Sequence, residues 1–217
     1  MPKSVSFYTK CQDVTDIHVL SVFGSREFGL PGCLIQVGNV KTVTRVYGYR
    51  KFSKKTHQVL DRYDLTFPEI VLETEAVWMN LSFSIKERME SLNLCLMSAI
   101  HGASHLVSSL TPLFVLCDES CDLDTECQSP LEERQKPFRI LIFDRKSGGV
   151  GICRELFFKF EDCLRTAHDA LSRCSCESGC PSCIHRFSCH EFNAALDKKA
   201  TKFLLHAILS GSLLCEL

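Results

Sequence analysis

Short hydrophobic runs rich in valine, threonine and tyrosine recur through the N-terminal part of the chain, residues 1–80. Runs of this kind, separated by glycine and polar turns, are typical of β-strands. The expected strands cover residues 4–9, 17–23, 33–37, 40–52 and 71–79. The pattern therefore predicts a largely antiparallel sheet.

The period of the hydrophobic pattern changes after residue 84. From Ile85 to Leu110, apolar residues recur every three or four positions, which is the spacing of one helix face. Pro112 cannot continue such a helix. The pattern predicts one long packing helix over residues 84–112.

The second half of the chain alternates between polar segments and strongly apolar ones. Residues 118–136 are acidic, polar and contain proline, which predicts a flexible loop. The elements expected after it are a strand and helix joined by a glycine turn (138–173), a cysteine-rich knuckle (174–193) and a last amphipathic helix (194–210). Together the elements predict a single α+β domain over residues 1–217.

The composition suits one folded core and excludes several classes of protein. The chain is 45% hydrophobic and 24% charged, and it has neither an apolar signal segment nor an apolar run of about 18 residues. We therefore expect no membrane partner. The net charge is −1, whereas a free-standing nucleic-acid binder is usually basic. Any contact with DNA is expected to use a local patch or another domain.

Five of the fourteen cysteines fall within residues 174–189. Without an export signal, clustered cysteines indicate metal-bound thiolates in a reducing compartment rather than disulfides. Zinc prefers four soft ligands, and two cysteines separated by two residues clasp one ion on a tight turn. We predict one structural Zn²⁺ bound by Cys176, Cys180, Cys183 and Cys189, with Cys174 as the reserve ligand. A redox Cys-x-x-Cys pair is the alternative, and the three extra thiols disfavour it.

A glycine-rich turn, Ser147-Gly148-Gly149-Val150-Gly151, separates the predicted strand from its helix. Amides at a helix N-terminus attract anions, so contact between DNA phosphate and Gly148 or Gly149 is one hypothesis. No Gly-Lys-Ser/Thr triplet occurs there, so the turn is not a Walker loop. The favoured interpretation is a tight connection that needs positive φ.

His101 and His105 lie four positions apart on one face of the predicted helix. This spacing can hold a metal ion, but the residues between them lack the glutamate of a zinc protease. We interpret them as packed histidines. The alternative is a second site with hard oxygen ligands from nearby acidic residues, Asp118, Asp122, Asp124 and Glu126.

The most basic stretch, residues 41–55, interleaves lysine and arginine with Tyr47, Tyr49 and Phe52. Cations beside aromatic rings suit contact with the backbone and bases of a single strand. A solvated strand-and-turn face explains the same charges equally well. The residues expected to contact nucleic acid are Arg45, Arg50, Lys51 and Lys54.

The cysteine-rich segment also carries a family resemblance. Residues 174–184, Cys-x-Cys-x3-Cys-Pro-Ser-Cys-Ile, with Cys189, Asn193 and the start of the last helix, resemble the zinc-binding (MZB) domain of MrfA-type superfamily-two repair helicases. Residues 44–50, 68–78, 99–105 and 143–151 agree with the same family. Ser147 stands where the family usually has proline, and residues 189–193 look like the eukaryotic branch.

The resemblance implies an ATP-dependent helicase that moves 3′ to 5′ along single-stranded DNA and serves DNA repair, with the zinc domain helping to hold the unwound strand. This sequence carries no ATPase or other catalytic motif, so ATP would be a cofactor only with a motor domain present elsewhere. The implied partners are single-stranded DNA and helicase motor domains in cis, or a repair partner in trans, in the nucleus. A stand-alone zinc-stabilised protein-interaction module is the rival hypothesis.

Overall fold

The computed structural model describes residues 6–127 and 136–214. Its strands are β1 (Phe7–Glu27), β2 (Leu34–Ser53), β3 (Val59–Asp64), β4 (Ile70–Asn80), β5 (Leu123–Thr125) and β6 (Arg139–Asp144). They form one sheet in the order β1-β2-β4-β6-β5, with β3 paired to β2, and each of these pairings is antiparallel. The predicted antiparallel sheet and α+β class are confirmed.

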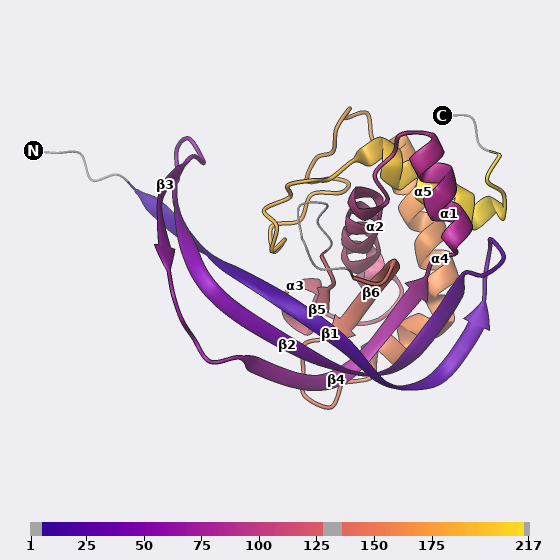
Figure 1. The fold of residues 1–217 in the computed structure, drawn as a ribbon, viewed down its shortest axis with the longest axis horizontal. Helices are drawn as coiled ribbons and strands as arrows, with labels where there is room; N and C mark the ends of the chain where they lie inside the picture. The colour runs from indigo at the N-terminus through magenta and orange to yellow at the C-terminus, as the bar shows by residue number, and fades with distance from the viewer. Residues whose placement is uncertain (1–5, 128–135, 215–217) are drawn as a thin grey trace, which may run out of the picture.

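The helices gather over one part of the sheet (Figure 1). They are α1 (Phe83–Ser91), α2 (Leu96–Leu110), the 3₁₀ turn η1 (Thr111–Leu113), α3 (Glu119–Asp122), α4 (Ile152–Arg173) and α5 (Lys198–Ser210). Beyond them the sheet continues as an extended arm, which we call the β arm: residues 7–16, residues 44–53 and β3 (Figure 1). None of the helices in the described part of the chain has the length and apolar character that a membrane crossing needs.

The first strands are longer than the sequence predicts. A single strand, β1, replaces the two expected at residues 4–9 and 17–23, and β2 joins those expected at 33–37 and 40–52. The β1–β2 register shifts at three places, between residues 12 and 13, 19 and 21, and 22 and 24. Because each shift reverses which side chains face the core, the alternation breaks and one long strand resembles several short ones.

The single helix predicted over residues 84–112 is wrong, because the chain forms α1 and α2 with a break between them. Asn93 adopts a left-handed conformation (φ 57°) and ends the first helix. The hydrophobic period runs through the break because both helices bury a face against the same core, with Met89 and Leu96 on either side of it.

The flexible loop predicted over residues 118–136 is wrong for its first half, and residues 128–135 lie outside the described structure. Residues 119–125 form α3 and β5, and Leu123 is fully buried. The acidic composition hides this strand because the carboxylates in it and directly after it are paired in the interior, Asp124 with His190 and Glu126 with Arg139.

The two last helices follow the predicted pattern with one change. Helix α4 ends at Arg173 as expected. Helix α5 begins at Lys198 rather than at residue 194, because the Asp197 carboxylate accepts the amide of Ala200 at 3.0 Å and caps the helix there. Ala195 has φ 56°, which no helical residue adopts.

Two apolar clusters lie on opposite faces of the sheet. Alternate residues of β4 divide between them: Val77 and Met79 join the large cluster beneath the helices, whereas Ala76 and Trp78 join a smaller one. Helices α2 and α5 meet closely at Gly102, where an added Cβ would lie 2.3 Å from Oγ1 of Thr201. The large cluster therefore fixes α2, which carries both histidines, at the centre of the molecule.

The glycine turn after β6 has the backbone that the sequence predicts. Gly148, Gly149 and Gly151 have φ of 78°, 75° and 88°. The amides of Gly148 and Gly149 donate to the carbonyls of Glu73 and Lys146 at 2.8 and 3.0 Å. The Asp144 carboxylate accepts the amides of Val150 and Cys153. The hypothesis of a DNA phosphate held by Gly148 and Gly149 therefore lacks free donors, and the interpretation as a tight connection holds.

We expect Gly149→Ala to lower the free energy of unfolding by about 1–3 kcal/mol more than Gly148→Ala. Both changes force alanine into positive φ, which costs about 1–2 kcal/mol. An added Cβ at Gly149 also meets Cγ of the buried Glu75 at 2.5 Å, whereas at Gly148 it meets nothing within 4 Å. Urea unfolding of the two variants measures the difference, and equal losses would contradict it.

Candidate metal centre

Four thiols converge where α4 ends. Cys174 is the C-terminal cap of α4, and the turn that follows contains Gly179 in a positive-φ conformation. The Sγ atom of Cys174 lies 3.4 Å from that of Cys176 and 3.5 Å from that of Cys180. The Sγ atom of Cys183 lies 3.5 Å from that of Cys176 and 3.7 Å from that of Cys180. Four sulfurs bound tetrahedrally at about 2.3 Å from zinc would lie about 3.8 Å apart, so the cluster fits the ion.

Hydrogen-bond donors lie beside two of these sulfur atoms, and the pKa is lowered at one of them, Cys176. The amide of Cys180 donates to Sγ of Cys183 at 3.2 Å, and Nζ of Lys198 lies 3.4 Å from Sγ of Cys176. Desolvation acts in the opposite direction, but hydrogen bonds from Cys174, Cys183, Cys180 and Lys198 lower the pKa of the Cys176 thiol to about 6. A thiolate is the form that binds metal. A set of four cysteines leaves no open position for a catalytic water, so one structural Zn²⁺ fits this knuckle.

The structure corrects the predicted ligand set at one position. Cys176, Cys180 and Cys183 come together as expected, but their fourth neighbour is Cys174, the predicted reserve, and Cys189 lies elsewhere. Spacing alone did not distinguish the two. The deciding feature is the end of α4, which points the Cys174 side chain back toward the turn.

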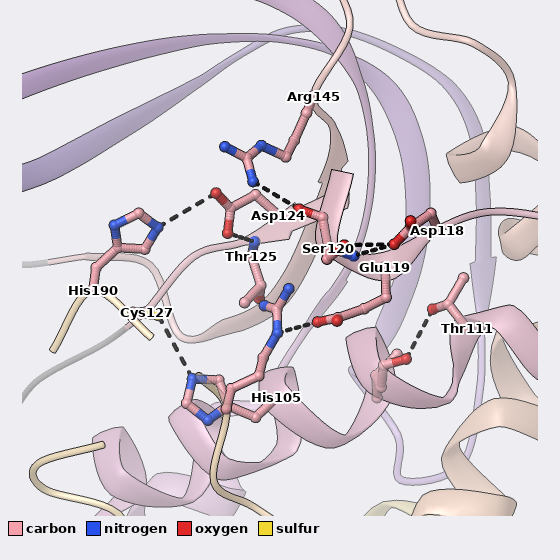
Figure 2. Close-up of polar contacts among 12 residues, drawn as sticks. His105, Thr111, Asp118, Glu119, Ser120, Asp124, Thr125, Cys127, Arg145 and His190 are labelled. Carbon is pink, nitrogen blue, oxygen red and sulfur yellow. Dashed lines mark hydrogen bonds and ion pairs between the residues drawn. The ribbon is translucent and has the colours of Figure 1, made fainter. Parts of the chain in front are cut away.

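Cys189 lies instead against α2, in a group with His101, His105 and Cys127. Figure 2 shows the contact between Cys127 and His105. Hydrogen bonds from the Cys127 thiol, and then from the two histidines, lower the pKa of Cys189 well below its usual range although burial opposes them. His101 and His105 are buried, as predicted, but their neighbours are thiols.

The alternative site with acidic ligands finds no support among the described residues, because the structure gives each of its four carboxylates another partner. Asp118 caps α3, where its Oδ1 accepts the amide of Ser120 at 2.9 Å (Figure 2). Asp122 Oδ2 accepts the amide of Asp118 at 2.9 Å. Asp124 binds His190, and Glu126 binds Arg139. Because His190 donates hydrogen bonds to the carboxylates of Asp124 and Asp13, its pKa rises to about 10 and the imidazole is a cation at neutral pH.

The basic residues singled out in the sequence lie on the β arm in different environments. Arg45 donates to Glu69 and Asp16 at 2.6 and 2.7 Å, so two carboxylates neutralise it. Lys51 lies over the rings of Phe7 and Tyr63. Lys54 is exposed in the turn before β3. The structure therefore leaves Arg45 poorly suited to a phosphate and keeps Lys54 accessible.

The knuckle also contacts the β arm, which the sequence did not predict. Arg50 lies 4.7 Å above the ring of Phe192, and Lys10 lies 4.8 Å above the same ring. Lys10 donates to the carbonyl of Phe187 at 2.8 Å, and the Phe187 ring is 89% exposed. The exposed Phe187 ring lies beside Lys10, and Arg50 reaches the same loop at Phe192. Only the folded chain reveals this surface, since residues 10, 50 and 187 are far apart in sequence.

Comparison with known proteins identifies the segment around the thiols. Residues 103–184 match the family model of the MrfA Zn-binding domain (MZB). The ATP-dependent helicase HRQ1 of Saccharomyces cerevisiae is 26% identical over 96% of this chain and 20% of its own length. The hrq1 helicase of Schizosaccharomyces pombe is 28% identical over 83% of this chain and 18% of its own length. The chain thus spans about a fifth of the length of the curated relatives it matches.

A solved structure shares the fold. A crystal structure of the DUF1998 helicase MrfA bound to DNA superposes with a TM-score of 0.60 and 23% identity, over 94% of this chain and 26% of that one. Another crystal structure of MrfA gives a TM-score of 0.51 with 22% identity, over 78% of this chain and 22% of that one. The likeness extends over sheet and helices alike.

Proposed function

Since the chain carries an MrfA Zn-binding domain, we propose that it is the zinc-stabilised accessory part of an ATP-dependent DNA helicase and helps to hold single-stranded DNA. The observation that carries the proposal is the match of 96% of the chain to one segment of a helicase. ATP hydrolysis and translocation, 3′ to 5′ by the family resemblance, would belong to motor domains in the same polypeptide or in a separate one.

The surface between the β arm and the knuckle supports a role in holding DNA. Single strands bind on aromatic rings that stack with bases, beside cations that follow the backbone. Phe187 offers such a ring, and Lys10 is the cation adjacent to it. Arg50 contacts the same loop at Phe192, and Lys54 lies exposed in the turn that follows β2. We propose this surface as the contact, in place of the glycine turn and Arg45.

The exposed Phe187 ring gives the sharpest test. We expect Phe187→Ala to weaken binding of a fluorescent oligothymidine by about 1–3 kcal/mol, the stacking contribution of one base. Phe158→Ala is the matched control, because Phe158 is also a highly exposed phenylalanine (76%) but lies on α4. Fluorescence anisotropy at low salt measures both variants. Equal affinities for the wild type and Phe187→Ala would exclude this ring as the contact.

Charge reversal tests the cations separately. Arg50→Glu and Lys54→Glu are expected to weaken binding and to flatten its dependence on salt, because each removes a phosphate contact. Arg45→Glu is expected to change binding less, since Asp16 and Glu69 already neutralise that arginine. An unchanged salt dependence in the Arg50 and Lys54 variants would contradict the proposed surface.

A protein-interaction module is the second candidate, and one observation favours it. The net charge is −1, and β1 exposes a strip of apolar side chains, Val19, Leu20, Val22 and Phe23. Helicase motor domains are the partner that fits the comparisons. A zinc-loaded chain with no measurable affinity for single strands at low salt would favour this candidate.

The cellular setting follows from the same proposal. A chain that handles DNA for a repair helicase of the eukaryotic branch would act in the nucleus. Imaging of the tagged chain in a eukaryotic cell tests this location, and a purely cytoplasmic distribution would contradict it.

A further inference from the structure

Four potential metal ligands from three separate segments meet beside α2. His101 and His105 come from the helix itself, Cys127 follows β5, and Cys189 lies in the loop between Cys183 and α5. Both histidines are fully buried and Cys189 is 1% exposed. Their ligand atoms all lie within 4.8 Å of one another. The group is therefore compact, largely shielded from water, and separate from the four thiols of the knuckle.

The distances within the group match a tetrahedral ion. The Sγ atom of Cys189 lies 3.4 Å from Nε2 of His101, and that of Cys127 lies 3.8 Å from Nε2 of His105. Sulfur and nitrogen atoms bound to one zinc at about 2.3 and 2.0 Å lie about 3.5 Å apart. The two imidazole rings meet edge to face, with centroids 4.5 Å apart at 75°, so they converge rather than stack.

The hydrogen bond at His105 leaves its Nε2 free to bind a metal. Nδ1 of His105 lies 2.7 Å from the carbonyl oxygen of Ile184. A carbonyl only accepts, so Nδ1 carries the proton and the lone pair of Nε2 points toward the thiols. A metal-bound histidine usually donates its other ring N–H in this way.

His101 turns the same ring nitrogen toward the thiols. The ring is fully buried, and its Nε2 lies 3.4 Å from Sγ of Cys189. A metal ion bound to Nε2 would leave the ring proton on Nδ1, which has no hydrogen-bond partner among the described residues. Both histidines therefore present Nε2 to the ion.

We propose that His101, His105, Cys127 and Cys189 form a second zinc site, with two cysteine and two histidine ligands. Two thiolates and two neutral imidazoles balance the charge of Zn²⁺ and fill its four positions, so the site is structural. Soft sulfur and imidazole ligands disfavour Mg²⁺ and Ca²⁺. The family match, residues 103–184, contains all four knuckle thiols but neither His101 nor Cys189.

A second ion would fasten the knuckle loop to the core. Cys183 belongs to the first cluster and Cys189 to the second, so the six-residue step between them is held at both ends. That step contains Phe187. The proposed site thus gives the exposed ring a fixed position, although the site stands on its own geometry whether or not the ring binds DNA.

The number of zinc ions per chain tests the proposal. The full chain, purified under reducing conditions, is expected to hold two zinc ions by elemental mass spectrometry. Cys127→Ala and Cys189→Ala are each expected to retain one, and so is the knuckle variant Cys180→Ala. Cys163→Ala, which removes a buried thiol outside both clusters, is the matched control and is expected to retain two. One zinc in the wild type, all of it lost in Cys180→Ala, would overturn the second site.

X-ray absorption at the zinc edge keeps the test decisive if a variant fails to fold. The wild-type chain with both sites filled averages about three sulfur ligands and one nitrogen ligand per zinc, because one site has sulfur ligands alone and the other has equal numbers of sulfur and nitrogen. Sulfur ligands with no nitrogen would contradict the proposal. A disulfide between Cys127 and Cys189 in the reduced preparation, detected by mass spectrometry, would contradict it equally.

Discussion

Replacing Cys176 with serine is expected to release the knuckle zinc and to lower the free energy of unfolding by about 5 kcal/mol or more. The Cys176 thiol contacts those of Cys174 and Cys183. Serine is a poor zinc ligand, and the three remaining thiols cannot complete the tetrahedron. The four thiols hold the tetrahedral arrangement only in the folded chain. Any loss of zinc affinity therefore lowers the free energy of unfolding.

Thermal unfolding with and without a zinc chelator, under reducing conditions, measures this effect. The wild type is expected to lose most of the same stability when the chelator is added, whereas the variant is expected to change less. Cys11→Ser is the control, because Cys11 is exposed on β1 and belongs to neither thiol cluster. A Cys176→Ser variant as stable as Cys11→Ser would show that the knuckle does not depend on metal.

The second large effect is expected from Glu126. Removing its carboxylate is expected to lower the free energy of unfolding by about 3–5 kcal/mol. Glu126 accepts from Nε and Nη2 of Arg139 at 2.8 and 3.2 Å, and both side chains are almost wholly buried, 2% and 5% exposed. The same guanidinium donates to the carbonyl of Ile17 at 3.1 Å, so it ties β6 to β1. Glu126→Ala removes both of these charge-assisted hydrogen bonds from an almost wholly buried guanidinium.

Urea unfolding of Glu126→Ala beside Glu69→Ala measures the effect of burial on an ion pair. Glu69 also pairs with an arginine, Arg45, but its side chain is 52% exposed. An exposed pair contributes about 0–1 kcal/mol. Losses of similar size in the two variants would mean that the Glu126–Arg139 pair is not shielded as the structure shows.

The elements that could be predicted from the sequence are those whose signals are local. Sheet type, the buried strand before the glycine turn, helix α4 and the knuckle cysteines all depend on residues a few positions apart. The period of three to four residues did not reveal the break at Asn93, because α1 and α2 bury their faces against one core. The bulges in β1 had the opposite effect: they interrupt the alternation of side chains, so the pattern predicted two strands where the chain forms one.

The metal ligands show why long-range contacts were missed. Cys189 stands six residues after Cys183, so spacing placed it in the knuckle, whereas the fold turns it toward α2. Cys127 lies in a segment whose acidic composition indicated a flexible loop. Only the folded chain brings residues 101, 127 and 189 together, and no local pattern encodes that meeting. A buried histidine pair in a cysteine-rich chain is the one signal that pointed there.

The two metal clusters and the β arm define one surface. The knuckle and the proposed second zinc site hold the loop that carries Phe187, and Lys10 and Arg50 connect this loop to the arm. In this proposal zinc has a structural role, because it would fix the positions of the Phe187 ring and of the two cations. Removal of zinc is therefore expected to weaken DNA binding together with stability.

The most direct test of the proposed function is the affinity of the zinc-loaded chain for single-stranded DNA over a salt series, with a duplex of the same length as comparison. We expect weak binding that strengthens as salt falls, prefers the single strand and disappears with the chelator. Affinity that is absent at low salt in a chain that holds its zinc, or that is equal for duplex and single strand, would contradict the account.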